Sequence, residues 1–298
     1  MTDLTLNYVA RHLPRRPDNA HKGMMGTLCS ITGSYGFSGA AVLSARAALR
    51  SGVGLLYQVI PEKIYPVYAA SVYESVCVPV RGNVLGTVAP TDSDAILNTV
   101  DRASAVLIGC GMGNTSATAE VLRTVVRHSA VPVIIDADGI NALALHKDIL
   151  NERRAPLILT PHVKEFSRLS GLSVPTVIER QAEVAENFSK ELPDIVLVLK
   201  SHRTVIARSG ELYRNTAGNS GMAKGGSGDV LAGIIASLAA QGAAPFEAAA
   251  MGAHIHAVAG DIAAEKFGKT AMLPSDIVDC LGEVFKQVEA VRNAWPQK

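Results

Sequence analysis

The chain has 298 residues, and its 28 Lys and Arg residues nearly balance its 27 Asp and Glu residues, which leaves a formal net charge of +1. This balance argues against a protein that binds nucleic acid through phosphate attraction and against a polybasic membrane anchor. Hydrophobic residues make up 48% of the chain and charged residues 18%, a composition that excludes intrinsic disorder.

After a polar lead-in through Lys22, strand-like and helix-like segments alternate along the chain. Apolar runs predict strands over residues 27–33, 55–60, 74–79, 103–109, 131–135, 157–159, 195–199 and 204–207. Helical composition predicts helices over residues 40–51, 114–128, 179–191, 229–241, 245–267 and 274–292. Continuous apolar strands separated by helices indicate an α/β protein with a parallel sheet covered on both faces. No repeat or linker interrupts the pattern, so we expect one domain over residues 1–298, with its core over about 21–293.

Polar or glycine-rich turns follow four of the predicted strands. In a doubly wound sheet, ligands bind beyond the carboxyl ends of the strands, so these turns are expected to line one crevice. They are residues 33–39, residues 109–113, the pair Asp136 and Asp138, and Thr160-Pro161-His162. Neither glycine turn fits the GxGxxG or P-loop pattern, so no standard dinucleotide or P-loop fingerprint is present.

The strongest local signal is the run Gly225-Gly226-Ser227-Gly228-Asp229, which directly precedes an apolar helix. Backbone amides at such a helix N-terminus form an anion site. Asp229 has two interpretations, because aspartate is also a favoured helix cap. The density of glycines favours a catalytic carboxylate, since capping needs no glycines whereas close approach to a phosphate does.

These residues resemble the anion hole and aspartate of the ribokinase-like fold, and further segments narrow the family. The segments are His21-Lys22-Gly23 and residues 136–143, 159–166 and 218–226. Together they are similar to the ADP- or ATP-dependent NAD(P)H-hydrate dehydratases, from about His21 to the last predicted helix. The resemblance implies a three-layer ribokinase-like α/β fold, with a mostly parallel sheet and helices on both faces.

The resemblance also implies an activity: dehydration of the S-form of hydrated NADH or NADPH back to the normal cofactor, a metabolite repair by a hydro-lyase. A nucleotide would phosphorylate the ring hydroxyl, and phosphate would then leave. Relatives without a fused epimerase commonly use ADP, so ADP giving AMP is expected, with ATP as the alternative. Mg²⁺ is expected with the nucleotide, and a homotetramer is expected as the assembly.

The resemblance also implies roles for single residues of this chain. Asp229 is expected to be the base and to contact the substrate. The anion hole is then formed by Gly226, Ser227 and Gly228, with Gly228 also near the nucleotide. The further expected substrate contacts are Ala40, Gly111 and His162. The nucleotide contacts are expected at Lys200, Ser201, His202, Arg203 and Thr204. Two structural alternatives stay open: His162 as a turn histidine, and residues 200–204 as an ordinary β-turn.

This chain departs from the family pattern at three places. Ser201 replaces a usual glycine, Cys110 replaces a usual proline, and Val163-Lys164 replaces Pro-Gly after Thr-Pro-His. None of these changes removes a reacting group. The change at Ser201 affects the expected geometry of nucleotide contact.

Cysteine and histidine spacing indicates no dedicated metal site. Cys29, Cys77, Cys110 and Cys280 are far apart, which predicts buried, reduced thiols in a reducing compartment. His254 and His256 lie on different faces of a predicted helix, which favours helix packing over metal binding. We expect Asp136 and Asp138 to assist a Mg²⁺ held mainly by nucleotide phosphates, and the sequence identifies no firm metal ligand.

The N-terminal sequence and the hydropathy predict a cytoplasmic protein. The chain has no run of about 18 apolar residues, so no membrane span is expected. Asp3 comes early and no apolar signal region follows it. Arg11, Arg15 and Arg16 leave a transit peptide as an alternative, against which Asp3 and Asp18 weigh.

Two other functions share the same motifs. A ribokinase-like small-molecule kinase would use the same base and anion hole and release the phosphorylated product intact. A non-catalytic nucleotide-binding regulator would need no base, so Asp229 beside the glycines argues against it.

Overall fold

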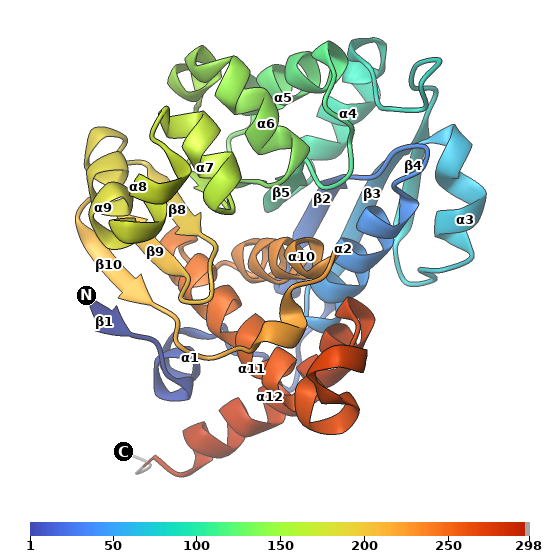
Figure 1. Ribbon diagram of the computed structural model, residues 1–298. Helices are drawn as coiled ribbons and strands as arrows, with labels where there is room; N and C mark the ends of the chain where they lie inside the picture. Colours follow the sequence, from blue (N-terminus) through green and yellow to red (C-terminus); the bar gives the residue numbers. More distant parts are fainter. Residues whose placement is uncertain (296–298) are drawn as a thin grey trace.

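The structure, a computed structural model, describes residues 1–295 and contains one ten-stranded sheet in the order β1-β10-β9-β8-β7-β6-β5-β2-β3-β4 (Figure 1). The strands are β1 (Thr2–Asp3), β2 (Thr27–Ile31), β3 (Leu55–Pro61), β4 (Val76–Val80), β5 (Ala105–Ile108), β6 (Val133–Ile135), β7 (Leu157–Leu159), β8 (Ile195–Leu199), β9 (Val205–Arg208) and β10 (Glu211–Arg214). Neighbouring strands are parallel except where β9 meets β8 and β10. The predicted α/β class with a mostly parallel sheet is confirmed.

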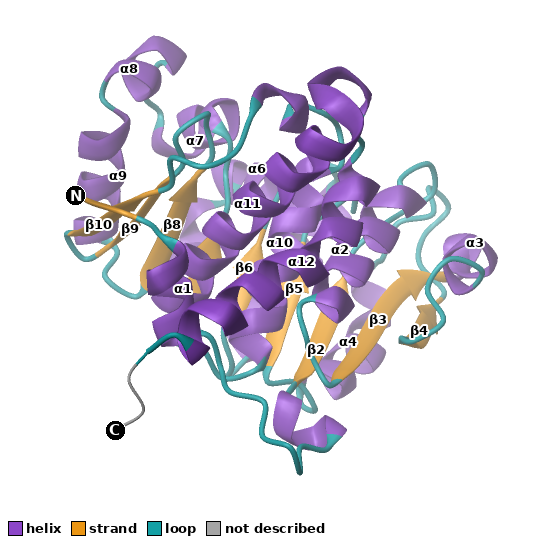
Figure 2. Cartoon of the chain, turned by 90° about the horizontal axis from the view of Figure 1, so that it is seen from below, coloured by secondary structure: helices purple, strands orange, loops and turns teal. Residues whose placement is uncertain are grey.

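Helices cover both faces of the sheet, as Figures 1 and 2 show. One face carries α1 (Leu6–His12), α2 (Ser38–Arg50), α10 (Ser227–Ala240), α11 (Pro245–Ala271) and α12 (Pro274–Asn293). The other carries α4 (Ser93–Val100), α5 (Ser116–His128), α6 (Asp138–Leu145), α7 (Val163–Ser170), α8 (Val174–Glu179) and α9 (Gln181–Glu191), and α3 (Tyr65–Ala69) lies beside β4. The arrangement has the three layers that the sequence predicts.

Each central strand supplies both cores, because successive side chains of a strand point to opposite faces. In β5, Ala105 and Leu107 pack with α2 and α10–α12, whereas Val106 and Ile108 pack with α4–α7. Burial on both faces explains why these strands are continuous apolar runs in the sequence.

The segment before residue 21, which the sequence presents as a polar lead-in, contributes two elements. β1 adds to the sheet beside β10, and α1 buries Val9 and Ala10 between the sheet and the C-terminal helices. Both elements depend on residues more than 200 positions away, so no local pattern predicts them.

Several boundaries differ from the sequence prediction for local reasons. The helix expected from Asn114 begins at Ser116, because the Thr115 hydroxyl accepts the Thr118 N–H as the cap. The long helix α11 has a non-helical residue at Gly268 (φ 75°), next to the predicted end at residue 267. β10 and the helices α3, α4, α6, α7 and α8 were not predicted.

The four cysteines are free, and Cys29, Cys110 and Cys280 are buried, whereas Cys77 is only partly buried. Within residues 1–295, no helix combines the length and the apolar composition needed to cross a membrane.

Candidate active site

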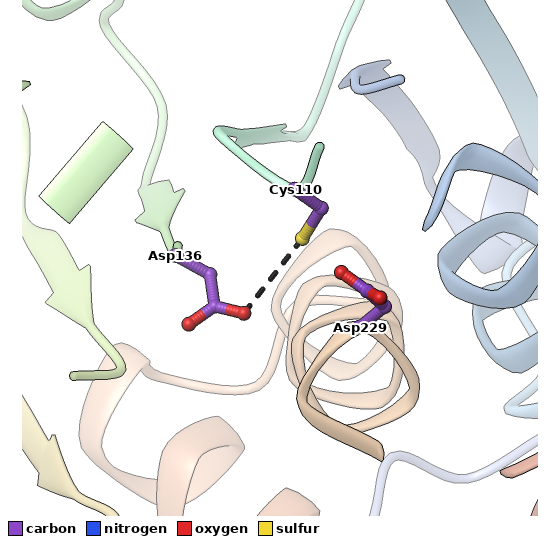
Figure 3. Close-up of side chains that lie close together, drawn as sticks. All are labelled: Cys110, Asp136 and Asp229. Carbon is purple, nitrogen blue, oxygen red and sulfur yellow. Dashed lines mark hydrogen bonds between the residues drawn. The ribbon is translucent and has the colours of Figure 1, made fainter. Parts of the chain in front are cut away.

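Three reactive side chains converge beyond the carboxyl ends of β5 and β6, at the N-terminus of α10. They are Cys110, Asp136 and Asp229, and Figure 3 shows them pointing toward one another. Their thiol and carboxylate atoms all lie within 4.8 Å of one another. These side chains lie where the strand order predicts a ligand site.

A buried ion pair anchors this cluster. The Lys200 ammonium donates to Asp136 Oδ1 at 2.7 Å, and the Thr160 hydroxyl donates to the same oxygen at 2.8 Å. Only 2% of the Asp136 side chain and 18% of the Lys200 side chain are exposed. Burial opposes the charge on Lys200, but the Asp136 and Glu165 carboxylates outweigh it and raise the pKa of Lys200 above its ordinary value.

Asp229 lies in the first turn of α10 and is partly buried. Burial, reinforced by the negative charge of Asp136, raises the pKa of Asp229 from 3.8 to about 6. The neighbouring Cys110 is fully buried beside both carboxylates, which together with burial raise the pKa of its thiol well above 9.0. Cys110 is therefore a neutral S–H donor, whose sulfur lies 3.8 Å from Asp136 Oδ2. A carboxylate whose pKa lies near neutrality is suited to accept a proton.

At the N-terminus of α10, the three residues expected to form an anion hole differ in their backbone hydrogen bonds. Gly226 precedes the helix in the left-handed conformation, and the amides of Gly226 and Gly228 meet no acceptor within the described residues. The Ser227 amide instead bonds to Lys224 O at 3.3 Å. A Cβ on Gly228 would lie 3.3 Å from the Lys200 ammonium, so this glycine keeps the space beside the cation open.

We expect Gly226→Ala to lower the free energy of unfolding by about 1–2 kcal/mol through left-handed strain alone. The φ of Gly226 is +98°, and a Cβ there would also meet Leu43 Cδ1 at 2.6 Å. Gly225→Ala is the matched control, because no atom lies within 4 Å of a Cβ at that position. Urea unfolding of both variants measures the difference, and equal stability would contradict the strain argument.

His162 caps α7 and lies at the edge of the same crevice. Its ring Nδ1 accepts from the backbone N–H groups of Lys164 and Glu165, and the Glu165 carboxylate accepts from the His162 N–H at 2.8 Å. The backbone of His162 pairs with that of Lys200 in an isolated parallel bridge, next to the ion-paired lysine. His162 thus has the structural turn role that the sequence analysis kept as an alternative. Its side chain is still 48% exposed.

The expected substrate contacts Ala40 and Gly111 lie against each other. A Cβ on Gly111 would come within 2.7 Å of the Ala40 Cβ, so a larger residue does not fit there. The Gly33 amide donates to Cys110 O at 2.8 Å, and the Ser34 hydroxyl donates to Gly111 O at 2.8 Å. These bonds join the two glycine-rich turns into one wall of the crevice.

Residues 200–204 form the turn between β8 and β9, which are antiparallel. The Ser201 hydroxyl accepts from the Arg203 N–H and donates to Gln181 Oε1, both at 3.0 Å, and the Ser201 N–H meets Thr204 Oγ1 at 3.4 Å. The serine that departs from the family pattern thus fastens the turn to α9. His202 and Arg203 are exposed, and Lys200 points inward to Asp136.

Sequence reasoning missed two side chains of this site. His256, interpreted as a packing residue, is buried but also lies 3.3 Å from the Ser227 hydroxyl in the anion site. Burial, then the nearby Lys200 charge, lowers the pKa of His256 to about 4, so the ring is neutral. Glu165 is buried as well, and burial raises its pKa to about 7. Glu165 belongs to the segment 159–166 that carries part of the family resemblance. No local sequence signal relates His256 to Ser227, which is 29 residues away.

The chain is similar to known proteins over most of its length. Residues 28–282 match the family described as NAD(P)H-hydrate dehydratase. The chain is 38% identical over 287 residues to the bifunctional NAD(P)H-hydrate repair enzyme Nnr of Moorella thermoacetica, covering 96% of this chain and 54% of that protein. It therefore spans about half the length of that relative.

A second relative is similar over most of its own length. The ADP-dependent (S)-NAD(P)H-hydrate dehydratase of Neisseria meningitidis is 36% identical over 283 residues, which are 93% of this chain and 88% of that protein. The crystal structure of the ADP/ATP-dependent NAD(P)H-hydrate dehydratase of Bacillus subtilis, co-crystallised with ATP/Mg²⁺, superposes with a TM-score of 0.81 at 28% identity, covering 96% of this chain and 98% of that one.

Proposed function

The chain belongs to the NAD(P)H-hydrate dehydratase family, and we propose on this premise that it dehydrates the S-form of hydrated NADH or NADPH, with ADP or ATP as phosphoryl donor. The observation that carries the proposal is the position of Asp229. This residue combines a pKa near 6 with a place in the first turn of α10, next to the Gly228 amide, which has no acceptor among residues 1–295, and near the Lys200 ammonium.

The first step is phosphoryl transfer to the ring hydroxyl of the hydrated cofactor. Asp229 accepts the hydroxyl proton, the oxygen bonds to the terminal phosphorus, and the bridging P–O bond breaks to release AMP from ADP, or ADP from ATP. The amides of Gly226 and Gly228, with the Lys200 ammonium beside Gly228, stabilise the charge on the transferring group. The turn at residues 200–204 holds the rest of the nucleotide.

The second step is loss of phosphate. The ring nitrogen supplies electrons as the C–O bond breaks, and loss of a proton from the neighbouring carbon restores the ring double bond. Phosphate leaves far more readily than hydroxide, which is why the reaction consumes a nucleotide. Ala40, Gly111 and His162 hold the dinucleotide, as the family resemblance implies, and Gly111 lets its turn pack closely against Ala40.

The site fits a Mg²⁺ ion bound chiefly through phosphates. Mg²⁺ uses oxygen ligands and commonly takes only one or two carboxylates beside phosphate and water. Asp136 and Asp138 would hold the ion. Asp136 Oδ1 already accepts hydrogen bonds from Lys200 and Thr160. Asp138 Oδ2 accepts from the Gly113 N–H at 2.8 Å. When bound, the ion neutralises phosphate charge.

The deciding experiment incubates the purified chain with hydrated NADH, Mg²⁺ and either ADP or ATP. Recovery of the reduced-nicotinamide absorbance with release of phosphate supports the dehydratase and identifies the donor. A phosphorylated dinucleotide that accumulates without recovered absorbance would instead establish a kinase. Nucleotide binding without either product would establish a regulator. Parallel reactions with hydrated NADPH measure the preference between the two substrates.

The activity is expected to depend on pH through the ionisation of Asp229. The base must be deprotonated, and the folded pKa lies near 6, so kcat/KM is expected to fall as the pH drops through about 6. An aspartate with an ordinary pKa would retain activity down to about pH 4. Initial rates between about pH 5 and 8 distinguish these cases, and a profile flat down to pH 5 would contradict the role of Asp229.

The family resemblance supports three further proposals about the whole protein. Residues 1–298 form one domain, the protein is a homotetramer, and it works in the cytoplasm beside its soluble substrates. Light scattering of the purified protein measures the assembly.

A further inference from the structure

A large pocket lies at the amino ends of the strands, on the side of the sheet's edge opposite to the candidate active site. Its volume is about 910 Å³, and it is lined by the segment after α1 and by the C-terminal ends of α2, α10 and α12. α10 carries Asp229 in its first turn and ends next to Gln241, which lines the pocket. This helix has 14 residues and is therefore about 21 Å long, so the pocket and the candidate active site are separate.

Arginine side chains make this pocket basic. Its lining contains Arg15, Arg16, Arg50 and Arg292, whereas Glu289 is the one acidic residue in that lining among residues 1–295. The whole chain has a net charge of only +1, so the excess of cations is local. The planar fork of N–H donors on arginine matches the oxygens of a phosphate group. The lining therefore favours a phosphorylated ligand.

Two of these arginines hold the backbone around the pocket. Arg292 donates to the backbone carbonyl groups of Ala10 and Leu13. Arg16 donates to Gly52 O at 2.8 Å. These bonds join the segment after α1 to α12 and to the turn after α2, so the walls of the pocket are built from fixed elements.

The other two arginines are available to a ligand. Arg15 and Arg50 are exposed, and neither side chain makes a hydrogen bond or an ion pair within residues 1–295. Burial lowers the pKa of Arg292 and the Arg15 charge lowers it further, whereas Glu289 raises it. Arg15 and Arg292 are thus close enough to repel each other, and an anion between them would relieve that repulsion.

Aromatic side chains and a serine complete the lining. Trp295 and Phe285 are partly buried there, and aromatic rings stack with nucleobases. The Ser51 hydroxyl is buried and has no hydrogen-bond partner within residues 1–295. Buried polar groups are normally paired, so this hydroxyl indicates a partner from outside the chain, such as a ligand oxygen.

We propose that this pocket binds a nucleotide, whose phosphates pair with Arg15 and Arg50 and whose base stacks with Trp295. Its volume agrees, because pockets for small molecules are commonly about 300–1,000 Å³. A free nucleotide fits better than nucleic acid, because the positive charge is confined to one pocket of a nearly neutral chain. The proposal concerns a second site and does not depend on the dehydratase activity.

Trp295 is the one tryptophan of the chain, so its fluorescence reports on this pocket directly. We expect ADP to change the fluorescence of the wild type saturably. Arg15→Ala and Arg50→Ala are each expected to weaken this binding about tenfold, the worth of one hydrogen bond to a charged group, without lowering the melting temperature. If the arginines only stabilise the helix ends, both variants would melt earlier and bind ADP as the wild type does, which would overturn the proposal.

Arg46→Ala is the matched control. Arg46 lies one turn before Arg50 on α2, but it pairs with Asp279 at 3.3 Å and is not part of the lining. Its replacement is expected to leave the response to ADP unchanged. A loss equal to that in Arg50→Ala would show a general charge effect and overturn the proposal.

Pyrophosphate separates the two parts of the ligand. It is expected to displace ADP from the pocket but to change the fluorescence of Trp295 much less, because it has no ring. Failure to compete would contradict the role of the arginines, and an equal fluorescence change would contradict stacking. A single-stranded oligonucleotide that binds more tightly than ADP would establish a nucleic-acid surface instead.

Equilibrium dialysis with labelled ADP tests the pocket without relying on fluorescence. The double variant Arg15→Ala/Arg50→Ala is expected to bind one ADP fewer per chain than the wild type. Equal numbers would overturn the proposal. If the wild type fails to restore NADH, the proposed function fails, whereas this difference in bound ADP still decides whether the second site exists.

Discussion

Replacing Asp229 by asparagine is expected to lower kcat about 10²–10⁴-fold, the usual contribution of a positioned base, while nucleotide affinity stays close to that of the wild type. Asparagine has nearly the same shape but accepts no proton. The amides of Gly226 and Gly228 and the Lys200 ammonium remain in place to bind phosphate. Single-turnover assays with hydrated NADH and binding titrations with ADP measure the two effects separately.

The melting temperature of Asp229→Asn tests whether a loss of turnover reflects the lost base and not a loss of folding. Burial and Asp136 raise the pKa of Asp229, which means that the charged form is disfavoured in the folded protein. The asparagine side chain carries no charge, so the melting temperature of Asp229→Asn is expected not to fall at pH 8. Asp279→Asn is the control, because Asp279 is exposed in a surface pair with Arg46. Unchanged turnover in Asp229→Asn would remove Asp229 from its role, and equal losses in both variants would indicate a general defect.

Replacing Lys200 by methionine is expected to destabilise the protein by about 3–5 kcal/mol, because it leaves the Asp136 charge buried without its partner. The two groups form a 2.7 Å ion pair in which Asp136 is almost wholly enclosed. The double variant Lys200→Met/Asp136→Asn is expected to recover part of this loss, since no unpaired charge then remains. Urea unfolding with a constant m value measures each difference.

Lys266→Met is the matched control for the lysine substitution. Lys266 pairs with Glu283 at 2.8 Å, a similar distance, but both side chains are 48% exposed. Solvent screens a pair of this kind, so Lys266→Met is expected to unfold at nearly the same urea concentration as the wild type. If the two lysine variants were equally stable, the ion pair of Lys200 and Asp136 would not anchor the site as we describe.

The layers of the fold could be predicted because burial leaves a direct mark on composition. β5, β6, β7 and β8 are enclosed on both faces, so each is a short apolar run that the sequence presents plainly. The weakly marked elements were missed for the opposite reason. β1 is the edge strand and β10 lies next to it, and the residues of both are exposed or partly exposed. α1 is held by packing against distant helices.

Some features of the candidate active site could likewise be predicted from the sequence, and others could not. The glycine run before α10 predicts its own conformation, because Gly226 occupies a left-handed position that other residues rarely adopt. Asp136 and Lys200, in contrast, are 64 residues apart, and their ion pair exists only because β6, β7 and β8 are neighbours. The contact of His256 with Ser227 likewise requires α11 to cross beside the start of α10.

The sequence alone determined the α/β class, the alternation of strands and helices, and the positions of the glycines and of Asp229 at the start of α10. These follow from hydrophobic periodicity and from local backbone conformation, which neighbouring residues specify. Only the tertiary structure decided which charges are paired and which carboxylates have raised pKa values. Those properties depend on burial and on partners from distant strands, because desolvation and charge interactions act through space and not along the chain.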